Sequence, residues 1–539
     1  MDQTLSARTV LPLRILLLAS LVAGLVYYVA TSIHWPIVWD AAVMHYVTFL
    51  MDHGLKPYSE ITDSNMPGSY IVETVGMHLF GRGDLAWRFF DLFLCGAITL
   101  ASVEIARPVD WIAGVYGGLF FTLMHGVDGP RFGGERDLVI TALLICGLAF
   151  LFRALRGNRA LWMLPFGLTG SLAAAIKPTS VPVCVLLLLA ATLLLRRRRQ
   201  PVAPYVLWTL AGALVMALVV VGFLVRHHAF RDFFFVVRYL LPSYISLQQL
   251  GFARLTQLLF PNSVLLILAL AALLAVLHRP WTAERRMILL CLLFGAFSYY
   301  SQRKGYPYHR YPLLAFLLLF VGMEILSGLR RSGLSRALAA LAIAVSVFVT
   351  EPHLLRPLRT EGLIFPRNML DQLSGDLGQI GIDQLQRNIQ CFDITYGCFS
   401  ALYHLGILQS NGFTGDLLFF SPTEGTAVNY YREMFWRLDA ARPTQVLVIS
   451  NQWFQKSNTF DKLAAWPAFD AYLKDRYTLV VSRSFPVNLG PPAPGDPPEP
   501  AYRIYIRNDS PLLGQIRERN TFGRAASHQF HPDLFISSK

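Results

Sequence analysis

The stretch that decides the fold class is residues 180–199, SVPVCVLLLLAATLLLRRRR, in which a largely apolar run ends on four consecutive arginines. An apolar helix of about 20 residues crosses the hydrocarbon core of a bilayer, and the run 180–195 is a short example of such a helix. Arginines at the end of an apolar run mark its cytoplasmic end. The stretch therefore predicts a transmembrane helix with Arg196 to Arg199 in the cytoplasm.

Ten further apolar runs flank this one along the chain. They lie near 11–30, 85–105, 111–127, 137–154, 161–176, 203–225, 259–278, 287–301, 311–328 and 337–350. If the first run enters from the cytoplasm, alternation places three more arginine clusters on that side: Arg156 with Arg159, Arg285 with Arg286, and Arg330 with Arg331. Because parity and charge bias agree, the sequence predicts an α-helical polytopic membrane protein of about eleven spans, with its N-terminus in the cytoplasm.

The composition of the chain agrees with this prediction. Hydrophobic residues make up 54% and charged residues 15%, against about 25% charged residues in soluble domains. A formal net charge of +13 could indicate nucleic acid as a partner, but most arginines lie in short clusters between apolar runs. The basic charge therefore reports the topology, with anionic membrane lipid as the partner and no nucleic acid.

Three acidic or mixed segments are expected outside the cytoplasm. They are residues 31–83, 128–136 and 351–539. In the last of these the composition becomes that of a soluble domain, and short β-rich runs alternate with helical stretches. The β-rich runs are 388–394, 444–450, 477–482 and 502–506. We therefore expect a membrane module at 1–350 and an extracytoplasmic α/β domain at 351–539, in a multi-pass protein of the cell (inner) membrane.

The first outer loop carries several carboxylates and few cations. Asp40 follows Trp35-Pro36-Ile37-Val38-Trp39 directly, where the first span emerges from lipid. Carboxylates at a membrane interface are costly unless they are solvated or paired, so they often mark functional sites. We interpret Asp52 and Glu60 as solvated residues of an acidic loop, and Asp40 as a candidate catalytic residue.

The second outer loop, from Asp128 to Asp137, reads DGPRFGGERD and places three carboxylates and two arginines in a short glycine-rich turn. Carboxylate oxygens of this kind bind hard divalent cations, and arginines bind phosphate. The alternative is a salt-bridged helix start, with Asp137 capping the next span. Because this loop faces the same side as Asp40, we favour the functional interpretation.

Cations also gather at the outer ends of the spans. Lys177 lies at the tip of a tight hairpin, and QRKGYPYHR at 302–310 precedes another span. A single basic residue at an interface is usually an anchor. The density around Lys304, His309 and Arg310 exceeds what anchoring requires, because outer loops are depleted of cations, and a phosphate-bearing lipid headgroup would explain it. Arg88 and Asp91, just inside the second span, look like an ion pair within the membrane. A purely structural role is an alternative for this pair.

Four of the six cysteines fall inside apolar runs, whereas Cys391 and Cys398 lie in the polar C-terminal third. These two are close enough in sequence to form a disulfide if the backbone turns between them, and their predicted compartment is oxidising. Both the bonded and the free state stay open from the sequence.

The order of these features resembles the GT-C glycosyltransferases, polytopic enzymes that use polyprenyl-phosphate sugars. The closest group is family-39-like, with the protein O-mannosyltransferases and the lipid A aminoarabinose transferases. The resembling pattern covers roughly residues 10–350. It comprises Trp39-Asp40, Gly54-Leu55-Lys56-Pro57-Tyr58, Asp63, Pro67, Tyr70, Arg88, Glu135-Arg136-Asp137, Lys177-Pro178 and Gly305-Tyr306-Pro307-Tyr308-His309. The chain departs from it at Asn65-Met66-Pro67-Gly68, where relatives often carry two adjacent prolines.

The resemblance implies a role for each matching position. Asp40 would be the catalytic base, with Glu135 and Asp137 as further catalytic residues that assist acceptor placement or bind a metal. Substrate contacts would be made by Asp63, Arg88, Arg136, Lys177, Lys304, Tyr308, His309 and Arg310. No cofactor follows from the sequence, and a divalent metal held by Asp40 and Asp137 is left open.

The implied function is transfer of a sugar from a polyprenyl-phosphate donor to a glycan, lipid or protein acceptor on the extracytoplasmic face. The alternative is a flippase or transporter of a lipid-linked sugar. That class would favour charges at mid-membrane and matching halves, whereas the centres of the apolar runs are almost free of ionisable residues. A glycosyltransferase is therefore the favoured hypothesis.

Overall fold

The computed structural model describes residues 2–247, 249–355, 364–453, 458–485, 499–519 and 522. The chain forms two compact units. The helical unit comprises residues 1–44, 65–230 and 248–364, and the sheet unit comprises 45–64, 231–247 and 365–539. Helix α2, Trp39–Asp52, belongs to both. We expected one domain boundary, after residue 350. The sheet unit also includes the earlier segments 45–64 and 231–247. The division into domains 1–350 and 351–539 stays a prediction.

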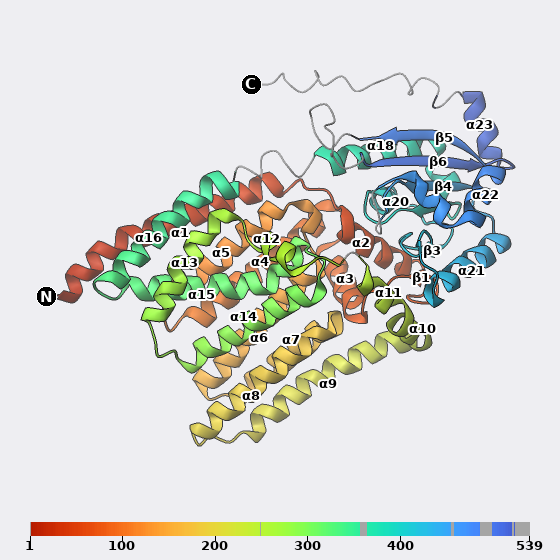
Figure 1. The fold of residues 1–539 in the computed structure, drawn as a ribbon. Coiled ribbons are helices and arrows are strands. Elements are labelled where there is room, and N and C mark those ends of the chain that lie inside the picture. Colours follow the sequence, from red (N-terminus) through yellow and green to blue (C-terminus); the bar gives the residue numbers. More distant parts are fainter. Residues whose placement is uncertain are drawn as a thin grey trace. The chain divides into compact units, whose positions relative to one another are not determined.

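The helical unit consists of helices joined by short loops (Figure 1). They are α1 Asp2–Ser32, α3 Pro67–Phe80, α4 Asp84–Ala106, α5 Trp111–Asp128, α6 Arg136–Gly157, α7 Met163–Ile176, α8 Val181–Arg197, α9 Ala203–Arg226, α12 Phe252–Leu259, α13 Asn262–Leu277, α14 Ala283–Gln302, α15 Tyr311–Leu329 and α16 Leu334–Val349. Three 3-10 turns, Pro130–Phe132, Pro178–Ser180 and Pro307–Arg310, precede α6, α8 and α15. Ten of the eleven predicted apolar runs each overlap one of these α-helices, whereas the run 259–278 begins at the last residue of α12 and continues through α13.

Not every helix is long enough to span a membrane alone. Among the described residues, six helices are long and apolar enough, or seven if the bent pair Phe252–Leu259 and Val264–Leu277 counts as one span. The apolar helices Ala160–Ile176 and Leu334–Val349 are shorter. The count of eleven spans therefore stays a prediction.

Small residues set the closest helix contacts, as is usual where lipid surrounds a bundle. A Cβ added to Gly117 in α5 would lie 2.7 Å from the Cα of Leu319 in α15, and one added to Gly167 in α7 would lie 2.1 Å from the carbonyl oxygen of Thr209 in α9. Larger residues at these two glycines would force the helices apart. Helix α15 is the best shielded of the spans, with 89% of its apolar window buried.

The sheet unit contains a four-stranded mixed sheet in the order β2-β4-β6-β5. Its strands are β2 Ile389–Phe392, β4 Val446–Ser450, β5 Tyr477–Ser484 and β6 Ala501–Arg507, and each overlaps one predicted β-rich run. Strands β2 and β4 are parallel, whereas β6 is antiparallel to both β4 and β5. A second, two-stranded parallel sheet joins β1 Ile61–Thr62 to β3 Gly412–Phe413.

Helices complete the sheet unit. They are α10 Phe230–Phe235, α11 Leu241–Ser246, α18 Ile364–Ile380, α19 Ile382–Leu385, α20 Cys398–Leu405, α21 Thr426–Ala441, α22 Pro467–Arg476 and α23 Pro511–Arg519. Every residue of β2 and β4 is buried, because aromatic side chains such as Phe392, Phe435 and Phe469 pack around them. Cys391 and Cys398 form a buried disulfide with their Cα atoms 6.1 Å apart.

Candidate active site

Asp40 occupies the first turn of α2, where the free N–H groups of a helix favour an acidic side chain. The residue before it, Trp39, has a left-handed backbone (φ 60°) that turns the chain into the helix. The Trp39 ring lies 4.9 Å from the Arg131 guanidinium and 6.2 Å from the ring of Phe132. The second outer loop therefore lies against the start of α2, and 30% of the Asp40 side chain is exposed.

Two predicted site residues hold the Asp40 carboxylate. Oδ2 accepts hydrogen bonds from the Tyr308 hydroxyl at 3.1 Å and from Nη2 of Arg136 at 3.4 Å. Among the described residues, none donates a hydrogen bond to Oδ1. One carboxylate oxygen is therefore fixed while the other is available to a substrate proton.

Glu135 occupies the N-cap position of α6, where its side chain makes no capping hydrogen bond, and it is only 2% exposed. It lines a cavity of about 10 Å³, enough for about one water molecule, together with Glu73 and Arg136. Its Oε1 accepts no hydrogen bond from the described residues. Burial, with a further contribution from Asp40, raises the pKa of Glu135 well above its ordinary value, so this side chain keeps its proton to higher pH.

Asp137 and Lys177 form an ion pair. Nζ of Lys177 donates to Oδ1 and Oδ2 of Asp137 at 2.8 and 2.7 Å, and to Oε1 of Gln302 at 2.9 Å. A divalent cation at Asp137 would have to displace this ammonium, so the residues present do not fit the metal site that the sequence left open at Asp40 and Asp137. The pair joins the first turn of α6 to the end of α7.

Three basic residues that were predicted to contact substrate lie just before α15. Lys304 is 9% exposed, and burial lowers its pKa to about 8. His309 is buried with its ring 4.6 Å from that of Tyr308, and its Nδ1 has no hydrogen-bond partner among the described residues. Arg310 donates to Asp128 at 2.7 Å and to two backbone carbonyl groups, so its guanidinium already has partners.

Solved structures match this architecture over nearly the whole chain. The crystal structure of ArnT from Cupriavidus metallidurans bound to undecaprenyl phosphate matches with a TM-score of 0.54 and 14% sequence identity, over 92% of this chain and 98% of that one. The apo structure of ArnT matches with a TM-score of 0.56, over 90% and 97%. The chain has the ArnT fold. No family profile matches the sequence, and no curated protein matches it either.

The ArnT fold confirms the predicted fold class. The chain is a mostly helical, multi-pass membrane protein with a mixed β-sheet in its C-terminal part. It also confirms the resemblance to the GT-C enzymes at the level of the fold, which sequence identity of 14% alone could not establish.

Within the ArnT fold, only some of the site residues expected from the sequence gather around Asp40, whereas Asp137 with Lys177 and Arg310 with Asp128 form pairs of their own. Asp40, Glu135, Arg136 and Tyr308 come together around one carboxylate, in the geometry given above. Arg88 lies apart from them in α4, fully buried and paired with Asp91, an arrangement that favours its structural interpretation. Its contact with substrate stays a prediction.

Asp63 belongs to the sheet unit of the ArnT fold. One of its carboxylate oxygens, Oδ1, accepts a hydrogen bond from the backbone N–H of Ser64 at 2.7 Å, as in a local turn. Its contact with substrate also stays a prediction.

Sequence reasoning missed Glu73 as a cavity residue, because it lies inside an ordinary helical stretch whose position beside Glu135 depends on helix packing.

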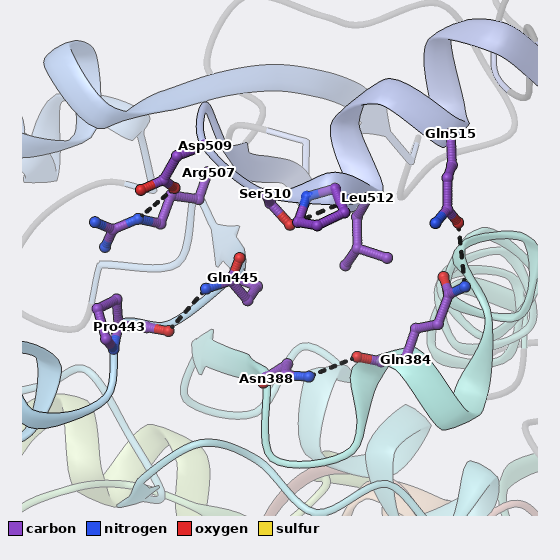
Figure 2. A pocket seen from close by; sticks show the side chains of 10 residues that line it. Gln384, Asn388, Pro443, Gln445, Arg507, Asp509, Ser510, Leu512 and Gln515 are labelled. Atoms are coloured by element: carbon purple, nitrogen blue, oxygen red, sulfur yellow. Dashed lines mark hydrogen bonds and ion pairs between the residues drawn. The ribbon is translucent and has the colours of Figure 1, made fainter.

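The sheet unit has an open hollow of about 550 Å³, lined mainly by amide and other polar side chains (Figure 2). Nε2 of Gln384 donates to Oε1 of Gln515 at 3.1 Å, and Arg507 pairs with Asp509 at 2.7 Å. Several of its polar groups thus pair with one another, and no residue predicted for the site lines it. The cluster around Asp40 is therefore the stronger candidate for an active site in this ArnT-like chain.

Proposed function

We propose that this protein is a membrane glycosyltransferase that moves a sugar from a polyprenyl-phosphate donor to an acceptor on the extracytoplasmic face, with Asp40 as general base. The observation that carries the proposal is the Asp40 carboxylate, with Oδ2 fixed by Tyr308 and Arg136 and Oδ1 without a donor among the described residues. The ArnT fold supports the choice of donor, since one ArnT structure is bound to undecaprenyl phosphate.

The reaction is a displacement at the anomeric carbon of the donor sugar. Oδ1 of Asp40 accepts the proton of an acceptor hydroxyl or amine, whose oxygen or nitrogen forms the new bond to the anomeric carbon. The bond from that carbon to the phosphate oxygen breaks, its electron pair leaves with the polyprenyl phosphate, and the configuration at the anomeric carbon inverts. A positioned general base contributes about 10²–10⁴ in rate.

Cationic side chains would stabilise the charge that develops on the leaving phosphate. Arg136 and Lys304 are the candidates for direct contact, and His309 would donate or accept a hydrogen bond. Arg136, Lys177 and Arg310 each have a carboxylate partner, so their contact with phosphate would require sharing that charge. The protonated form of Glu135, favoured by its burial, would donate a hydrogen bond near the acceptor instead of acting as a second base.

Reconstituted liposomes test this proposal and separate it from the alternative of a flippase. The purified full-length chain is supplied with a panel of undecaprenyl-phosphate sugars that carry a radiolabel in the sugar, and with a mixed pool of envelope lipids and glycans as acceptors. Label that passes to an acceptor, with release of undecaprenyl phosphate, supports the transferase. Labelled donor that crosses the bilayer without being consumed identifies a flippase and overturns the proposal.

A further inference from the structure

A buried polar network lies inside the helical unit and has no part in the chemistry described above. Arg88 forms an ion pair with Asp91, and neither side chain is exposed. Oδ1 of Asp91 also lies 3.0 Å from Nε2 of His125, and Nδ1 of His125 lies 2.8 Å from the hydroxyl of Tyr311. The network therefore links α4, α5 and α15.

Ligand binding does not account for this network. Asp91, Cys95 and His125 lie close enough together to hold a metal ion. Both ring nitrogens of His125 already have partners, however, and both oxygens of Asp91 are engaged by Arg88, His125 and a backbone N–H group. Both oxygens of the buried carboxylate and both terminal nitrogens of the guanidinium thus have partners, whereas Nε of Arg88 has none among the described residues. A buried pair of this kind is costly to assemble, so a structural purpose is the better explanation.

The partners of the Arg88–Asp91 pair lie beside the residues that hold Asp40. The backbone N–H of Gly134 donates to Oδ1 of Asp91 at 2.7 Å, two residues before Arg136. Tyr311 is reached through His125, and it lies three residues after Tyr308. Both hydrogen-bond donors to Asp40 thus belong to segments that this one buried carboxylate anchors.

Two further contacts tie the same segments down. Nη2 of Arg88 donates to the hydroxyl of Ser32 at 2.7 Å, at the end of α1 and eight residues before Asp40. A Cβ added to Gly134 would lie 2.4 Å from Nε1 of Trp87, the neighbour of Arg88, so the loop packs directly on this part of α4. Gly134 also has φ +65°, which a residue with a side chain rarely adopts.

We propose that Asp91 is the positioning residue of the Asp40 site, because it fixes the loop that leads to Arg136 and, through His125, the turn that carries Tyr308. The proposal rests on the proposed function for its effect on catalysis, but the positioning itself is a property of the fold. Asp91 contacts no substrate in this arrangement, and it acts only through the residues that it anchors.

A matched pair of double variants tests the proposal. Arg88→Met/Asp91→Asn removes the buried charges but keeps an oxygen that can accept from Gly134, whereas Arg88→Met/Asp91→Ala also removes that acceptor. Replacing a buried ion pair by neutral residues of similar volume is often tolerated, so the Asn variant should fold. Asp91→Ala leaves a small cavity and unpaired donors and should be less stable, so its folded fraction is measured first. Hydrogen–deuterium exchange of the peptides covering 129–136 and 306–311 is measured on the full-length protein in nanodiscs, together with thermal stability and sugar transfer.

We expect the Ala variant to exchange about tenfold or more faster in 129–136 than the Asn variant, beyond what its lower thermal stability accounts for, since it lacks the acceptor for the Gly134 N–H. Its kcat per folded molecule should fall while its KM for the donor stays within about twofold, as expected when an interaction of the transition state is lost. The rate is divided by the folded fraction, because unfolded protein alone would also lower the apparent kcat at constant KM. Tyr311→Phe should loosen 306–311 and leave 129–136 unchanged. Asp110→Asn, at another buried carboxylate whose partners Arg14 and Arg330 are more exposed, serves as the control.

Equal exchange in the Asn and Ala variants would overturn the proposal, as would a Tyr311→Phe variant with unchanged exchange in 306–311. If the wild type shows no sugar transfer with any donor, the proposed function fails, yet the exchange measurement still decides whether Asp91 positions the loop. If transfer is intact in the Ala variant although the loop is loosened, the positioning is irrelevant to catalysis and this inference is wrong.

Discussion

Replacing Asp40 by Asn is the most informative perturbation of the site, because it removes the base while disturbing the structure little. The Asn side chain keeps an oxygen that can accept from Tyr308 and Arg136. The ion pair that is lost joins side chains that are 30% and 28% exposed at 3.4 Å. Pairs of this kind contribute about 0–1 kcal/mol to stability, so the melting temperature should fall by no more than about 4 °C.

The expected effect on catalysis is much larger than the effect on stability. A general base contributes about 10²–10⁴ in rate, which corresponds to about 2.7–5.5 kcal/mol in activation free energy. Because Asp40 accepts its proton only as the acceptor attacks, the loss should appear in kcat, with the KM for the donor nearly unchanged.

Initial rates of sugar transfer in proteoliposomes, at saturating donor, measure this loss. Asp52→Asn is the matched control, because it makes the same change at an exposed carboxylate in the same helix and should keep full activity. Asp40→Glu keeps a carboxylate and should retain more activity than Asp40→Asn. The reasoning would be refuted by an Asp40→Asn protein with more than about a tenth of wild-type kcat, which lies outside the range expected for a general base.

Three further outcomes follow from the environments of the other predicted site residues. Lys177→Met leaves the carboxylate of Asp137, which is 4% exposed, without its ammonium partner and should lower the free energy of unfolding by about 3 kcal/mol. In thermal denaturation, Lys177→Met/Asp137→Asn should recover most of this loss, and no recovery would contradict a structural ion pair. Burial lowers the pKa of Lys304 to about 8, so the side chain is a cation below that pH and neutral above it. The KM for the donor should therefore rise in the wild type as the pH increases through about 8. It should not rise in Lys304→Arg, whose side chain stays charged. Tyr308→Phe removes one donor to Asp40 and should lower kcat about 3- to 10-fold in the same transfer assay, whereas an unchanged kcat would show that this hydrogen bond has no catalytic role.

The sequence by itself determined the helical scaffold and the sheet strands. Apolar runs become helices in lipid because every backbone polar group must be satisfied within the segment, so local composition is sufficient. The β-rich runs of the C-terminal part are similarly local, and all four reappear as β2, β4, β5 and β6. Asp40 could also be singled out, since its place at the edge of an apolar run beside two tryptophans is visible in the sequence.

The partners of the charged residues were decided only by the tertiary structure. Lys177 pairs with Asp137, which is 40 residues away in sequence, and Arg310 pairs with Asp128, which is 182 residues away. Two predicted phosphate ligands therefore have carboxylate partners. His125 gave no signal inside its apolar run, although it joins Asp91 to Tyr311. Pairings over such distances depend on which helix faces meet, and close contacts such as that of Gly117 with α15 set those faces. Local sequence fixes which segments are helical, whereas the energy of a buried charge depends on neighbours that only the packed bundle supplies.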